Sequence, residues 1–144
     1  PQVELEIIPG VTAATGGAAV LGAPLIHDFC LISLSDLLTP WEKIQNRLLA
    51  AAQADFVVCL YNPSSKKRHD YLQKACDLMM QYKSEDTVCG IVSYIGRDGE
   101  TQKVMSLKEL RDTPVDMFTT VWVGNSQTKE LNGKMVTPRG YKNV

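Results

Sequence analysis

The chain has 144 residues, of which 44% are hydrophobic and 22% are charged, and its net charge is −1. These values are typical of one globular domain that can bury a core, and they lack the overall positive charge that attracts nucleic acid or an anionic membrane. Because no apolar run approaches the roughly 20 residues of a membrane-spanning helix, we expect neither nucleic acid nor a membrane as partner.

The start of the chain predicts a strand, a turn and a helix of small residues. Residues 3–8 alternate apolar and acidic side chains, as in a strand, and Pro9-Gly10 ends this run. Residues 12–21 are mostly Ala, Gly and Thr, so a backbone or a flat ligand can approach closely, and the first turn offers free N–H donors beside Thr12 and Thr15. This arrangement is typical of cofactor binding at the carboxyl end of an α/β sheet, although tight helix packing favours the same residues.

The rest of the chain alternates expected strands and helices. Strands are predicted over residues 29–34, 55–61, 87–95, 101–105 and 118–123, with at most a short edge strand over 134–136. Helices are predicted over 40–52, from Ser64 or Ser65 to 82, and over 106–113. Capping boxes at Thr39/Glu42 and Ser106/Glu109 mark two of the helix starts. Residues 101–105 should pair back on the preceding strand as a hairpin. The order predicts one α/β domain with a mixed, largely parallel sheet flanked by helices.

The four cysteines, at positions 30, 59, 76 and 89, form no C-x-x-C pair and have no histidine nearby. Three of them lie in apolar runs, where cysteine acts as a small hydrophobic residue. We therefore expect reduced core thiols and no bound metal, with metal ligation or disulfides as alternatives. Reduced thiols indicate the cytosol.

Three cations, Lys66, Lys67 and Arg68, lie in the first turn of the helix predicted from Ser64 or Ser65. The helix dipole makes this placement unfavourable by up to about 1 kcal/mol per charge. A ligand carrying carboxylate or phosphate groups would explain the placement. An exposed turn whose charges are screened by salt is the other explanation.

Small or polar residues follow apolar runs at four places: Tyr61-Asn62, Gly90-Ile91, Thr119-Thr120 and Gly124-Asn125-Ser126. The carboxyl ends of strands line the ligand crevice in open α/β sheets. Since glycine inside a strand suggests close approach of another group to the backbone, we expect a ligand bound largely through backbone amides and carbonyls.

Sequence motifs of hydrolases, phosphate-binding loops and zinc proteases are absent. His27, Ser35 and Asp36, which flank the strand predicted over 29–34, are the remaining candidates for acid–base chemistry. A polar loop residue is the alternative interpretation of His27.

Two stretches, Pro9-Gly10-Val11-Thr12-Ala13-Ala14 and Leu21-Gly22-Ala23-Pro24-Leu25, resemble the linker and first helix of the second domain of the tetrapyrrole methyltransferases, which use S-adenosylmethionine. Residues 32–42, 60–65, 115–117, 124–126 and 137–141 are similar to the branch that methylates C17 of precorrin-3B or cobalt-precorrin-3. The likeness spans essentially the whole chain.

The resemblance implies a two-domain α/β methylase, usually a homodimer, that holds S-adenosylmethionine in a cleft between its domains and releases S-adenosylhomocysteine. It implies methylation of C17 of the macrocycle with ring contraction, in cobalamin biosynthesis. Residues 1–10 are then the strand and linker from a missing N-terminal domain, and residues 11–144 are the C-terminal domain. Such a domain supplies about half of the active cleft, and we expect it to fold but not to methylate alone.

The resemblance also implies roles for particular residues. The cofactor contacts would be Thr12, Ala13, Tyr61, Asn62, Gly90, Ile91, Thr119 and Thr120. The carboxylates of the macrocycle would meet Lys66, Lys67, Arg68, Arg97 and Arg139. Many superfamily members carry methionine in place of Asn62, so that contact should differ in kind. His27, Ser35 or Asp36 would assist proton movement during ring contraction.

Two other interpretations remain open. The chain could belong to another methylase of the superfamily, acting at a different ring position or on RNA or a modified protein. It could also be a non-catalytic α/β module whose small-residue helix and strands serve dimerisation. Binding of S-adenosylhomocysteine separates the methylases from this module.

Overall fold

The computed structural model describes residues 2–142 of the chain and consists of two sheets and four helices. The five-stranded sheet contains β2 (Phe29–Ser33), β3 (Val57–Tyr61), β4 (Val88–Ser93), β5 (Thr101–Ser106) and β6 (Thr119–Val123). The helices are α1 (Ala13–Leu21), α2 (Trp41–Gln53), α3 (Tyr71–Met79) and α4 (Leu107–Arg111). The three-stranded sheet contains β1 (Gly22–Ala23), β7 (Lys129–Leu131) and β8 (Lys134–Val136).

The large sheet has the strand order β2-β3-β6-β4-β5. The mixed α/β class is confirmed, but the expectation of a largely parallel sheet is wrong, because β2 and β3 form the only parallel pair within this sheet over residues 2–142. The β4–β5 pair is a hairpin through the glycines at 96 and 99, as expected, and β6 then enters between β3 and β4 in the antiparallel sense. As a consequence, the amino end of β6 lies at the same sheet edge as the carboxyl ends of β3 and β4.

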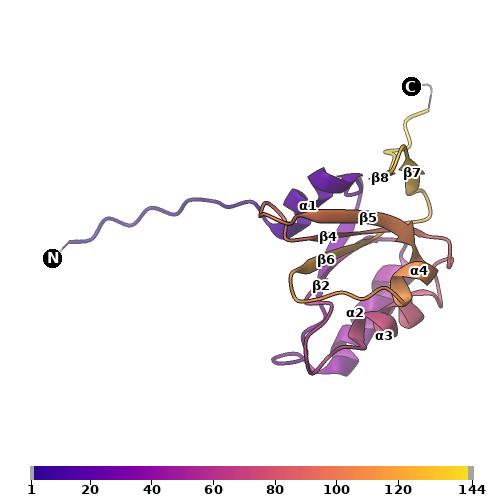
Figure 1. Cartoon of the computed structure of the whole chain (residues 1–144), viewed down its shortest axis with the longest axis horizontal. Coiled ribbons are helices and arrows are strands. Elements are labelled where there is room, and N and C mark those ends of the chain that lie inside the picture. Colours follow the sequence, from indigo (N-terminus) through magenta and orange to yellow (C-terminus); the bar gives the residue numbers. More distant parts are fainter. Residues whose placement is uncertain (1, 143–144) are drawn as a thin grey trace.

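Helices cover both faces of the large sheet (Figure 1). The larger apolar core lies between the sheet and the layer of α2, α3 and α4, where leucines and the sulfur-containing side chains of Cys76 and Met79 are fully buried. The smaller core lies on the opposite face, between α1 and the strands, around the buried indole of Trp122.

Close packing explains why the buried face of α1 is built from small residues. A Cβ atom at Gly17 would lie 2.2 Å from Trp122 Cη2, and one at Gly90 of β4 would lie 2.8 Å from both Leu21 δ-carbons. The indole Nε1–H of Trp122 also donates a hydrogen bond to the Ala14 carbonyl at 3.2 Å. Helix packing, one of the two explanations offered by the sequence, therefore accounts for the buried face, whereas the first turn of α1 remains accessible.

Residues 3–8 are not a strand in the structure. They are exposed and extended, and they project away from the domain as an arm (Figure 1). Their alternating pattern has no neighbouring strand within residues 2–142 on which to form a hydrogen-bonded ladder. The expected edge strand at 134–136 is also more than an edge, since β8 lies between β1 and β7.

Two helix starts differ from the prediction. Helix α3 begins at Tyr71 rather than at Ser64 or Ser65, because Asn62 adopts a left-handed φ of +54° and residues 62–70 form an irregular loop with turns at 66–67 and 69–70. Helix α2 has Pro40 as its N-cap, without the side-chain cap expected from Thr39. The second capping box is half confirmed: Ser106 Oγ accepts a hydrogen bond from the Glu109 backbone N–H at 3.2 Å.

Candidate functional site

One edge of the large sheet collects several of the predicted site residues. We call it the polar edge and define it by Ser33, Tyr61, Asn62, Ser93, Thr119 and Thr120. Register places these residues together, because Ser33 pairs with Tyr61 and Ser93 pairs with Thr119. The polar edge thus consists of the carboxyl ends of β2, β3 and β4 and the amino end of β6.

The start of α1 reaches the polar edge. The Ala14 backbone N–H donates to the Tyr61 hydroxyl at 2.8 Å, and Thr12 Oγ1 accepts from the Thr15 N–H at 3.4 Å. Ala13, the first residue of the helix, lines a hollow of about 190 Å³ together with Thr120 and Arg97. The structure therefore brings Thr12, Ala13, Tyr61 and Thr120 to one place, as the sequence predicted.

Two further residues of this edge are fixed by hydrogen bonds. Asn62 Nδ2 donates to Ser33 Oγ at 2.9 Å, and its left-handed φ is one that asparagine tolerates better than most residues. Thr119 is buried, and its hydroxyl bonds Ser93 Oγ at 2.9 Å and Asp116 Oδ1 at 3.0 Å. Thr119 thus holds neighbouring residues of the polar edge in place through hydrogen bonds, whereas Thr120 lines the hollow itself.

Gly90 and Ile91 do not lie at the polar edge. Both are in the middle of β4, where Gly90 faces Leu21 of α1 and Ile91 packs against the larger core on the other face. The absence of a side chain at Gly90 therefore serves packing against α1, not close approach of a ligand at the strand end. Gly124-Asn125-Ser126 follows the carboxyl end of β6, so it lies at the opposite edge of the sheet.

The loop before α3, residues 62–70, which we call the basic loop, borders a groove of about 530 Å³. Its lining residues are Leu37, Ser64, Ser65, Lys66, Lys67, Arg68, Val115, Asp116 and Met117. Lys66 and Lys67 are exposed in a turn rather than placed in a first helical turn. Arg68 is mostly covered and pairs with Asp36, with Nη1 and Oδ1 3.1 Å apart.

The three acid–base candidates do not converge. Ser35 and Asp36 follow β2 near the polar edge, whereas His27 precedes β2 at the opposite edge and bonds the Arg139 carbonyl oxygen through Nε2. Arg139 is likewise remote from the other predicted substrate-binding cations. The Tyr71 hydroxyl donates to Asp36 Oδ2 at 2.6 Å, and this bond and the Arg68 guanidinium hold the pKa of Asp36 below its ordinary value.

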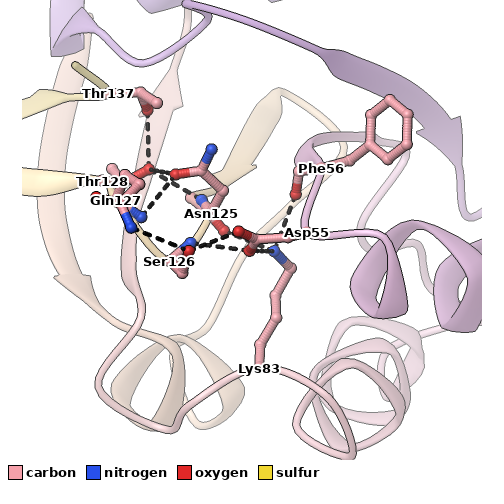
Figure 2. Close-up of polar contacts among 9 residues, drawn as sticks. Asp55, Phe56, Lys83, Asn125, Ser126, Gln127, Thr128 and Thr137 are labelled. Carbon is pink, nitrogen blue, oxygen red and sulfur yellow. Dashed lines mark hydrogen bonds and ion pairs between the residues drawn. The ribbon is translucent and has the colours of Figure 1, made fainter. Parts of the chain in front are cut away.

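The opposite edge holds a polar cluster around a buried lysine (Figure 2). Lys83 Nζ donates to the carbonyls of Phe56 and Gly124, both at 2.9 Å, and lies 3.8 Å from Asp55 Oδ1. Asp55 in turn accepts hydrogen bonds from the backbone N–H and hydroxyl of Ser126. Burial lowers the pKa of Lys83, because desolvation penalises its charge.

Sequence reasoning missed several of these residues. Tyr94, Ile95, Met117 and Phe118 line the hollow beside Ala13, and the rings of Tyr94 and Phe118 stack with centroids 5.0 Å apart. Met117 belongs to a stretch that resembles the family, and nothing in the local pattern marks the other three. Lys83 follows an amphipathic helix and has no sequence signal of burial, since its ammonium is satisfied by carbonyls distant in the chain.

All four cysteines are free thiols, and burial raises the pKa of Cys59 and of Cys76 to about 12. Over residues 2–142 there is no group of three or more His, Cys, Asp or Glu side chains placed to hold a metal ion. Within the same residues, every helix is too short or too polar to cross a bilayer.

Comparison with known proteins decides the family. The sequence model of the family of tetrapyrrole (corrin/porphyrin) methylases matches residues 1–111. The chain belongs to the tetrapyrrole methylase family. Among individual tetrapyrrole methylases, a probable cobalt-factor III C(17)-methyltransferase of Salmonella typhimurium is 50% identical over 140 residues, which are 97% of this chain and 58% of the relative. A precorrin-3B C(17)-methyltransferase of a Sinorhizobium species is 45% identical over 145 residues, covering 97% of this chain and 57% of the relative.

A solved methyltransferase has the same fold. The crystal structure of the methyltransferase CobJ matches with a TM-score of 0.84 and 36% identity, covering 94% of this chain and 56% of that chain. The chain therefore spans little more than half the length of each of these three proteins.

Proposed function

We propose that this chain forms the C-terminal domain of an S-adenosylmethionine-dependent methyltransferase that acts on C17 of precorrin-3B or cobalt-precorrin-3, with ring contraction, in cobalamin biosynthesis. The names and identities of the relatives support this reaction. The observation that carries the proposal is the gathering of strand ends and the start of α1 around one hollow at the polar edge. On this proposal, residues 1–10 connect to an N-terminal domain that completes the cleft.

The residues at the hollow fit one side of an adenosyl site. Ala13 contributes a small side chain and a backbone N–H that has no partner within its own helix, and Thr120 contributes a hydroxyl. Tyr61 and Thr12 hold the start of α1 in place, and Asn62 lies beside them. S-adenosylmethionine supplies a methyl group already activated on a sulfonium, so the demand on the protein is alignment of donor and acceptor.

The groove beside the hollow suits the proposed macrocycle. Leu37 and Met117 give it apolar walls, and Lys66, Lys67 and Arg68 give it positive charge, so it combines contacts for a flat ring with partners for carboxylates. Arg97 lies at the hollow and can meet carboxylates from that side. We further propose that the enzyme is a cytoplasmic homodimer. The homodimer rests on the family resemblance, and the location rests on the free thiols.

Calorimetric titration of the full-length protein with S-adenosylhomocysteine tests the cofactor proposal. Thr120→Val should weaken binding by about three- to tenfold through loss of one hydrogen bond. Thr113→Val is the matched control, because the Thr113 hydroxyl bonds the Glu109 carbonyl beyond the end of α4. Absence of binding to the unmodified protein would favour the non-catalytic dimerisation module.

Turnover with S-adenosylmethionine tests the substrate proposal. Full-length protein should add one methyl group to C17 of precorrin-3B or of cobalt-precorrin-3, whereas residues 1–144 alone should add none. A product methylated at another carbon would favour a different methylase of the superfamily.

A further inference from the structure

Asp36 ties two loops of the proposed substrate groove together. Its Oδ1 accepts a hydrogen bond from Arg68 Nη1 at 3.1 Å, and its Oδ2 accepts one from the Tyr71 hydroxyl at 2.6 Å. Asp36 belongs to the loop after β2, whereas Arg68 belongs to the basic loop and Tyr71 begins α3. Two segments remote in sequence therefore meet at one carboxylate.

These bonds leave Asp36 poorly suited to proton transfer. Both carboxylate oxygens are occupied by donors, and the Tyr71 hydrogen bond and the Arg68 guanidinium lower its pKa. The same bond raises the pKa of the Tyr71 hydroxyl. At neutral pH the pair is therefore a fixed carboxylate and a neutral phenol, and Asp36 has no proton to donate.

Arg68 is held in a position that the ion pair alone does not explain. Its side chain is 16% exposed, and Nε is enclosed without a hydrogen-bond partner among residues 2–142. Native proteins leave few buried donors unsatisfied, so each such donor requires a reason. Its only side-chain hydrogen bond over the described residues is the one to Asp36, so most of the five guanidinium N–H donors remain available.

The surroundings of Arg68 favour an anionic group on an otherwise apolar ligand. Arg68 lines the groove with Leu37 and Met117, whose side chains are 78% and 67% exposed. The acidic side chain of that groove, Asp116, is turned toward the start of β6, where its Oδ1 accepts from the Phe118 N–H at 2.9 Å and from the Thr119 hydroxyl.

We propose that Arg68 binds a carboxylate side chain of the macrocycle and that Asp36 is a positioning residue that holds the guanidinium toward the groove. Tyr71 supports Asp36 from its other oxygen. The proposal rests on the proposed function, since the macrocycle is the ligand in question. It replaces the acid–base role that the sequence suggested for Asp36 with a role in substrate binding.

A double-mutant cycle in the full-length enzyme tests this arrangement. Steady-state kinetics with the macrocycle should show KM raised by roughly ten- to one-hundredfold in Arg68→Gln, with a smaller change in kcat, because a charge-assisted contact to substrate is lost. Asp36→Asn should raise KM by roughly three- to tenfold. The double variant should match Arg68→Gln alone, because Asp36 acts only through Arg68.

Asp77→Asn is the matched control. Asp77 also pairs with an arginine, Arg111, but on the far end of α3, so its replacement should leave KM unchanged. If Asp36→Asn fails to fold, Tyr71→Phe removes a single hydrogen bond to the same carboxylate and should raise KM in the same direction.

The outcomes separate this proposal from the proposed function. Unchanged affinity of each variant for S-adenosylhomocysteine with a raised KM supports the role of Arg68. An unchanged KM in Arg68→Gln, additive effects in the double variant, or a fall in kcat alone in Asp36→Asn overturns it. Absence of S-adenosylhomocysteine binding by the unmodified enzyme overturns the proposed function and this proposal with it, and is visible before any variant is made.

Discussion

The packing of α1 on Trp122 predicts that Gly17→Ala destabilises the protein although alanine favours helices. The new Cβ would lie 2.2 Å from Trp122 Cη2, whereas carbon atoms pack at about 3.5–4.0 Å, so helix and indole must separate by more than about 1 Å. Overpacking of this kind costs about 1–3 kcal/mol, and loss of the indole N–H bond to Ala14 adds about 1–3 kcal/mol. After a gain of about 1 kcal/mol in helix propensity, the free energy of unfolding should fall by about 1–5 kcal/mol.

Urea and thermal denaturation followed by circular dichroism measure this effect, and the unfolding midpoint should fall by about 3–15 °C. Gly16→Ala is the control in the same helix, because its Cβ would meet Ile95 and Val11 at an ordinary 3.6 Å. That variant should be neutral or more stable by up to about 1 kcal/mol. Equal stability of the two variants would refute the packing explanation for the small residues of α1.

Three further predictions concern the rest of the molecule. Lys83→Met should cost about 2–4 kcal/mol of unfolding free energy, because it leaves backbone carbonyls without a donor. Since burial lowers the pKa of Lys83 from 10.5, the unfolded chain binds that proton more tightly, and the stability advantage of the wild type over the variant should grow as pH rises toward 10.5. A stability advantage that shrinks over that pH range contradicts the burial argument. Gly90→Ala should lower unfolding stability by about 1–3 kcal/mol through its clash with Leu21, with unchanged affinity for S-adenosylhomocysteine; weakened binding at full stability would restore Gly90 as a ligand contact. Iodoacetamide at pH 8 should modify half-buried Cys30 before Cys76, whose pKa is about 12. Mass spectrometry gives the order of modification, and the reverse order would show that Cys76 is accessible.

Local sequence patterns predicted most helices and strands of the fold, but they could not predict which strands pair or in which direction. The apolar runs at β3, β4 and β6 and the small-residue helix α1 lie close to where periodicity placed them. Strand direction was wrong for the two pairs that β6 forms, because β6 enters the sheet between β3 and β4 and an apolar run carries no information about its orientation. The start of α3 was wrong because the basic loop is shaped by Asn62 and by the tertiary pairing of Arg68 with Asp36.

In the candidate site, too, local features were predicted from the sequence, whereas features that depend on tertiary contacts were not. Strand ends predicted Tyr61 and Asn62 at the ligand edge, since the end of a strand is a local feature. Thr120 lies at the same edge because β6 runs antiparallel, which the sequence did not predict. Gly90 was misjudged, because a glycine in a strand indicates close approach of something without saying whether it is a ligand or the neighbouring Leu21. His27 was grouped with Asp36 although β2 separates them, because short distance in sequence is not short distance in space.

The central claim is that the polar edge and the start of α1 form one wall of the nucleoside site. A crystal structure of the full-length enzyme with S-adenosylhomocysteine tests it most directly. We expect the nucleoside to contact Ala13 and Thr120, with Tyr61 and Asn62 beside it. A bound nucleoside that touches none of these four residues would contradict the account.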